Sequence, residues 1–183
     1  MSARISPDAR VRGRKSGGFT LVELLIVVAI IALLAGIAVP SLMRGRMAGN
    51  EASAISSMRT IVSAQAAFAS TCGGGGYANS LVDLSLPPAV GTAAFIPVDL
   101  GAADPAGVPK SGYVFTITGG GSPVMDAAFT CNGTADDTMT QFFAQGDPVG
   151  SGMGTRFFGA DESGQIRQDT AQLADMLAGI PLK

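Results

Sequence analysis

The longest hydrophobic segment of the chain lies near its N-terminus. Residues 19–39 form a run of 21 residues with one charged side chain, Glu23. As an α-helix rising about 1.5 Å per residue, this run is about 32 Å long, close to the hydrocarbon thickness of a bilayer. The preceding segment carries five basic residues and one acidic residue, Asp8. The pattern predicts a membrane span whose N-terminal end stays in the cytoplasm.

Helical spacing returns after the span. Between residues 50 and 70, apolar side chains recur three and four residues apart, which predicts an amphipathic helix with one face toward a sheet. Glu51, Arg59 and Gln65 are expected in polar or boundary positions around this face. The expected apolar stripe consists of Ile55, Met58, Val62, Ala66 and Ala69, widened by Ile61 and Phe68.

Two residues near the outer end of the apolar run disfavour a regular helix. Gly36 lowers helix propensity, and Pro40 removes a helix hydrogen bond and crowds the preceding turn. We therefore expect a break or kink between these residues.

Alternation with a period of two begins at Gly112 and predicts an antiparallel sheet. The glycine run at 119–121 is expected to end the first strand, and residues 170–177 show a short helical pattern. Residues 71–110 are rich in glycine and proline and predict connecting loops. The expected strands cover residues 112–118, 124–129, 138–145, 155–159 and 165–168.

The sequence Gly18-Phe19-Thr20-Leu21-Val22-Glu23, followed by an apolar helix, resembles the N-terminal signal of type IV pilins and type II secretion pseudopilins. In that family a prepilin peptidase cuts after the glycine, here Gly18, and methylates the phenylalanine, here Phe19. The resemblance also implies that Glu23 pairs with the N-terminal amine of an adjacent subunit. A carboxylate inside a membrane span costs a few kcal/mol unless it finds a partner, and the amine freed at Phe19 is such a partner.

The resemblance implies an α+β, pilin-like fold in which a long N-terminal helix packs on a C-terminal antiparallel meander. It divides the chain into a cleaved leader (1–18), a transmembrane and assembly helix (19–40), an amphipathic continuation (41–70) and a globular loop-plus-sheet region (71–183). In this family the helix can open on assembly at the segment that corresponds to Gly36–Pro40.

A pilin-type chain is a structural subunit and not an enzyme. We expect a type IV pilus pilin, with a type II secretion pseudopilin or a minor pilin as the alternative. The implied partners are other pilin subunits, the prepilin peptidase and the inner-membrane assembly platform. The precursor is expected to span the inner membrane once with its C-terminal domain in the periplasm, before it enters an extracellular pilus or a periplasmic pseudopilus.

Other interpretations of the N-terminal segment stay open. An ordinary single-span anchor explains the apolar run but not Glu23 or the Gly18-Phe19 junction. A secretory signal cut at the small residues of 36–38 would release a soluble protein. The motif can also occur by chance. A membrane-anchored or secreted binding module is the alternative from a different functional class.

The composition limits the kinds of catalytic, metal and nucleic-acid-binding site that the chain can form. The chain has no histidine, which excludes catalytic sites and metal sites that use imidazole. Without residues 1–18 the net charge falls to about −6, since five of the 12 basic and one of the 14 acidic residues are removed. That charge argues against general binding to a nucleic-acid backbone.

Three further features concern cysteines, carboxylates and a short motif. In an exported domain, Cys72 and Cys131 are expected to form one disulfide, with two free thiols as the alternative. The acidic pairs at 136–137 and 161–162 are turn residues, although calcium stays a possible ligand because it prefers carboxylate oxygens. No other cofactor is expected. Residues 132–134 form a short glycosylation motif.

Overall fold

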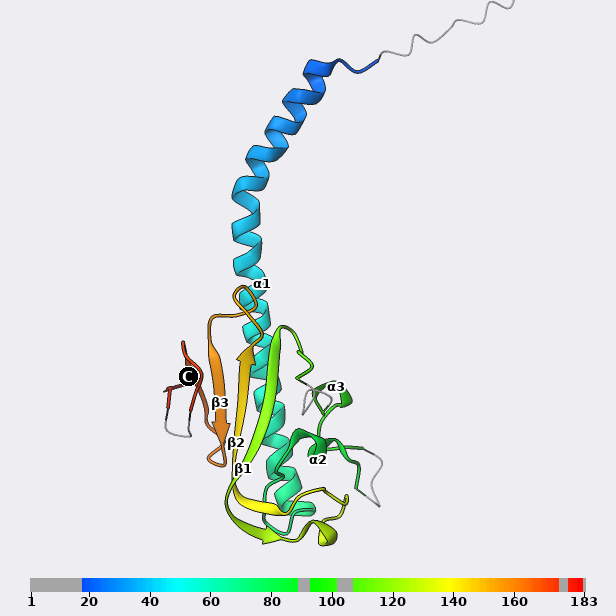
Figure 1. Ribbon diagram of the computed structural model, residues 1–183, viewed down its shortest axis with the longest axis vertical. Helices are drawn as coiled ribbons and strands as arrows, with labels where there is room; N and C mark the ends of the chain where they lie inside the picture. The colour runs from blue at the N-terminus through cyan, green and yellow to red at the C-terminus, as the bar shows by residue number, and fades with distance from the viewer. Residues whose placement is uncertain (1–17, 89–92, 102–106, 175–177, 183) are drawn as a thin grey trace, which may run out of the picture. The chain divides into compact units, whose positions relative to one another are not determined.

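The computed structural model describes residues 18–88, 93–101, 107–174 and 178–182. The chain divides after Pro40 into two units, residues 1–40 and 41–183, and each is described by itself. Helix α1 (Leu21–Thr71) is followed by the short helices α2 (Leu81–Ser85) and α3 (Val98–Gly101), and then by a five-stranded antiparallel sheet (Figure 1). The predicted α+β, pilin-like fold is confirmed.

Helix α1 is continuous and does not break at Gly36 or Pro40. The backbone is therefore not open at these residues in the isolated chain, and the expected kink stays a prediction. A proline removes a single helix hydrogen bond, and leucine and alanine, which favour helix, are frequent on the N-terminal side of Pro40. Whether the segment opens in an assembled filament stays a prediction.

The sheet is a simple meander in which each strand pairs with the next, in the order β1-β2-β3-β4-β5. Its strands are β1 (Tyr113–Met125), β2 (Thr138–Pro148), β3 (Phe157–Asp161), β4 (Ile166–Asp169) and β5 (Ile180–Pro181), with the 3-10 turn η1 (Ala127–Phe129) between β1 and β2.

The sequence-based strand boundaries are wrong around β1, and they also differ at β2 and β3, which were expected at 138–145 and 155–159. The glycines at 119–121 do not end β1, because Gly119 and Gly120 pair with Phe142 and Gln141 of β2. No separate strand covers residues 124–129, since β1 includes Met125 and η1 follows. Among the residues described at the C-terminus, 170–174 are not helical, residues 175–177 of that predicted helix lie outside the described chain, and β5 was not expected.

The hydrophobic core of the second unit lies between one face of α1 and one face of the sheet. In Figure 1 the C-terminal part of α1 runs behind β1 and β2. Met58, Ile61 and Phe68 are fully buried, as expected, but Ala66 is exposed. The buried residues of α1 are Glu51, Ala54, Ser57, Met58, Ile61, Ala64, Gln65 and Phe68.

The disulfide between Cys72 and Cys131 is present and confirms that prediction. It joins the end of α1 to the segment that follows η1, with the two Cα atoms 4.9 Å apart. In the chain-entropy account a bridge that closes a loop of this length stabilises by about 4 kcal/mol at most. The disulfide therefore fixes the segment between β1 and β2 against the C-terminal end of the helix.

Candidate functional site

The first turn of α1 forms a reciprocal cap. Thr20 precedes the first helical residue, Leu21, and its hydroxyl accepts a hydrogen bond from the backbone N–H of Glu23 at 3.2 Å. In return, Oε2 of Glu23 accepts from the backbone N–H of Thr20 at 3.0 Å and from its hydroxyl at 2.8 Å. This is a capping box, which satisfies two donors that a helix start otherwise leaves without partners.

The capping role of Thr20 was missed by the sequence analysis, although the signal was present. A threonine followed three residues later by a glutamate, just before an apolar run, is the pattern of such a cap. Glu23 therefore has a local role that needs no second chain. Whatever else it binds, it fixes where α1 begins.

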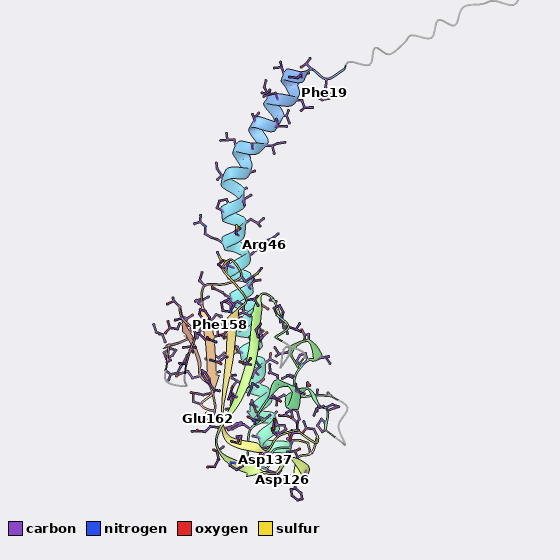
Figure 2. All side chains as sticks on the ribbon, viewed as in Figure 1. Phe19, Arg46, Asp126, Asp137, Phe158 and Glu162 are labelled. Atoms are coloured by element: carbon purple, nitrogen blue, oxygen red, sulfur yellow. A yellow bond between two sulfur atoms is a disulfide. The ribbon has the colours of Figure 1, made fainter. Side chains whose placement is uncertain are left out.

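Gly18 and Phe19 lie outside the helix. Both residues are exposed, Phe19 to 86%, and neither belongs to a regular element. Figure 2 shows Phe19 just before the first turn of α1. An exposed peptide bond in a non-helical segment is the kind that a protease can bind in an extended form. The predicted cleavage position between these residues thus immediately precedes the cap.

The apolar residues of α1 up to Val39 are exposed in their own unit. The large ones among them are exposed over at least half of their surface, with Leu21 at 80% and Leu33 at 69%. This helix is the one in the described chain that is long and apolar enough to cross a membrane, a test that a signal sequence near the N-terminus also passes. Such a surface is stable in lipid or against other apolar helices.

An ion pair between a buried carboxylate and a partly exposed arginine links α1 to the segment before β3 in the second unit. Oε2 of Glu51 lies 2.7 Å from one guanidinium nitrogen of Arg156 and accepts a hydrogen bond from its Nε at 2.8 Å. Oε1 accepts from the backbone N–H and the hydroxyl of Thr155 at 2.8 and 2.9 Å. Arg156 also donates to Gln168 on β4 at 2.7 Å.

Glu51 is only 7% exposed and its charge is stabilised by these partners. Burial acts to raise its pKa, but the hydrogen bonds from Thr155 and Arg156 and the guanidinium charge outweigh that effect, so the pKa of Glu51 lies below its usual value of 4.5. Sequence analysis had placed this residue at the polar edge of the helix, because hydrophobic spacing gives no sign of a satisfied buried charge.

The acidic pairs act as turn residues. Asp137 Oδ1 accepts from the backbone N–H of Ala127 at 3.0 Å, and Asp161 accepts from the backbone and hydroxyl of Ser163. No group of three or more acidic or cysteine side chains gathers within the described residues. Calcium binding stays an untested prediction.

The glycosylation motif contains an amide that the fold already uses. The side-chain nitrogen of Asn132 donates to the backbone carbonyls of Asp83 and Leu86 at 2.7 and 3.2 Å. A glycan on that nitrogen would remove at least one of these bonds and separate α2 from the segment beside the disulfide. The structure therefore favours a packing role for Asn132.

Comparison with known proteins identifies the N-terminal segment. Residues 13–39 match the family described as the prokaryotic N-terminal methylation motif, the signal of type IV pilins and pseudopilins. The match includes Gly18, Phe19 and Glu23 and ends at Val39, the last residue of the apolar run. No curated protein and no solved structure gives a significant match to the chain.

Proposed function

From the methylation signal of type IV pilins and pseudopilins at residues 13–39, we propose that this chain is a structural pilin subunit of a type IV pilus. A prepilin peptidase cuts the precursor after Gly18, the new amine of Phe19 is methylated, and α1 packs with its copies in the filament core. The observation that carries the proposal is a single carboxylate, Glu23, near the start of an exposed apolar run, residues 19–39, that has no other charge.

The geometry of Glu23 supports a role between subunits. Both hydrogen bonds that it accepts from Thr20 end on Oε2. Within the described chain, Oε1 of Glu23 accepts no hydrogen bond, so this oxygen is available to a donor from another molecule. The N-terminal amine of an adjacent subunit would be a charged donor at nearly the same depth, and charge-assisted hydrogen bonds are stronger than neutral ones.

This pairing would set the stagger between subunits. Apolar helices slide past one another with little change in van der Waals contact, whereas a misplaced carboxylate in an apolar environment costs several kcal/mol. Glu23 thus supplies register, and the side chains from Leu21 to Val39 supply most of the contact area. No catalytic residue or cofactor is needed for this function.

The N-terminal signal is shared by pilins and pseudopilins, so a type II secretion pseudopilin or a minor pilin is the second candidate. The disulfide that closes the C-terminal region and the lack of a recognisable calcium-loop spacing favour the pilin. The same proposal implies that the folded domain lies in the periplasm before assembly.

Intact mass of the chain purified from its membrane tests the proposal. A mature chain that begins at Phe19 and carries one extra methyl group is expected. A chain that begins at Met1, or one cut after Ala38 as a secretory signal would be, contradicts it. Electron microscopy of cells with and without the gene then separates pilus from pseudopilus, since only the former should be lost from the cell surface.

A further inference from the structure

A groove opens at one end of the second unit, beside the N-terminal part of its helix. Its volume is about 630 Å³, within the range of pockets that hold small molecules. Asn50 fixes one wall by donating to the backbone carbonyl of Met153 at 2.9 Å. The lining residues are Met43, Arg46, Gly49, Asn50, Ser151, Gly152 and Met153.

Two properties of the groove suit an aromatic side chain with an acidic neighbour. The methionine side chains are flexible and make favourable contacts with rings through sulfur. Arg46 is exposed and forms no ion pair within the part of the chain that the structure describes. A Cβ added at Gly49 would meet nothing within 4 Å, so the space beside the helix is open.

A projecting aromatic residue lies at the opposite end of the same unit. Phe129, the last residue of η1, is 77% exposed. Asp126 caps η1 by accepting from the N–H of Ala128 at 2.9 Å, and Asp137 accepts from the N–H of Ala127 at 3.0 Å. The disulfide at Cys131 anchors the turn two residues later. The exposed ring therefore extends from an ordered turn whose backbone N–H groups bind two carboxylates.

We infer that Phe129 of one copy inserts into the groove of a second copy, with Asp126 and Asp137 facing Arg46. The inference deepens the proposed filament function and rests on it. Figure 2 shows Arg46 at one end of the second unit, and Asp126 and Asp137 at the other. A contact between two different surfaces of identical chains can repeat from copy to copy. It builds an open helical filament unless the rotation between copies closes a ring.

The helix gives the expected spacing of the two copies. Because the disulfide holds the segment that carries Phe129 at the end of α1, the distance from Arg46 to Cys72 approximates the shift between copies. At 1.5 Å per residue this is roughly 40 Å along the helix. Charge complementarity at the contact selects this register over neighbouring ones.

Photo-cross-linking of assembled filaments tests the contact. Benzoylphenylalanine replaces Phe129 in the full chain, and filaments are irradiated and digested. We expect a cross-link between position 129 and the peptide that contains Met43 or Met153 of another copy. The same analogue at Val98, which is 79% exposed on α3, is expected to give no cross-link to that peptide.

A variant that fills the groove provides a second test of the contact. Gly49→Leu occupies the groove, whereas Gly45→Leu, one turn earlier and equally free of neighbours, leaves it open. We expect loss of the cross-link in the first variant and its retention in the second. Filaments whose position 129 is linked elsewhere, or linked to the groove despite Gly49→Leu, would overturn the contact and leave the pilin function intact. A processed chain that forms no filament would overturn both.

Discussion

Glu23 combines two roles that can be separated by substitution. Glu23→Gln keeps an oxygen that can accept from Thr20, so the helix cap is retained, but it removes the charge that would attract an amine. Glu23→Ala removes both. We expect membrane insertion and cleavage in both variants, and filament yield at least tenfold below wild type in both. Immunoblots of sheared filaments measure the yield, and Glu23→Gln filaments at wild-type level would show that the cap, and not the charge, is what assembly requires.

Glu51 should make the folded domain sensitive to acid. Its pKa is lower in the folded chain than the usual value of 4.5, so its contribution to stability is complete above about pH 5 and is lost as the pH falls through the folded pKa.

Arg156→Met leaves the carboxylate buried without its cation and should cost about 2 kcal/mol at pH 7. Chemical denaturation of the full chain in detergent measures both effects.

A matched control is the ion pair between Lys110 and Asp99, whose nitrogen and oxygen lie 2.9 Å apart and whose carboxylate is exposed. Lys110→Met should change the free energy of unfolding by less than about 1 kcal/mol, because water screens exposed pairs. Equal losses for Lys110→Met and Arg156→Met would show that burial of the Glu51 carboxylate does not make its ion pair more stabilising.

At the scale of elements, the sequence predicts well what hydrophobic spacing controls. The long helix and the approximate positions of β2, β3 and β4 follow from periods of 3.6 and 2, whereas the meander was implied by the resemblance to pilins. The buried face of α1 was misjudged because three polar residues, Glu51, Ser57 and Gln65, lie on it. Gln65 is fully buried, where its amide donates to the carbonyl of Ala78 at 2.8 Å and accepts from the N–H of the same residue at 2.9 Å. Burial of Gln65 depends on a hydrogen-bond partner outside the helix, which the spacing of residues within the helix does not reveal.

The role of the glycine run in β1 also could not be predicted from the local sequence. Gly119 was expected to end the strand, yet its N–H donates to the side chain of Asn79 at 2.7 Å, and a Cβ at this position would collide with that side chain. The glycine is present because a side chain from another loop approaches the backbone closely. In the N-terminal signal, by contrast, residues 18–23 are contiguous, and the motif could be identified from sequence alone.

The disulfide links the end of α1 to the segment that follows η1 and should stabilise the domain. Replacing both Cys72 and Cys131 by serine should lower the free energy of unfolding by about 3 kcal/mol, somewhat less than the entropic upper value because the unfolded chain retains structure. Denaturant titration of the full chain, oxidised and with the bridge reduced, measures the loss. No change in the denaturation midpoint would mean that the packing of the core alone fixes the segment around η1.

At the scale of the whole molecule, the two units differ in what they need from their surroundings. Every buried apolar residue of the core belongs to the second unit, whereas the apolar side chains of residues 19–39 are exposed in theirs. A chain of residues 41–183 should therefore fold with its disulfide and stay soluble without detergent, while the chain from Phe19 should aggregate unless lipid, detergent or other copies cover the helix. Circular dichroism and gel filtration of both chains measure this difference. If the shorter chain were unfolded, the N-terminal segment would contribute to the stability of the domain as well as to membrane anchoring and assembly.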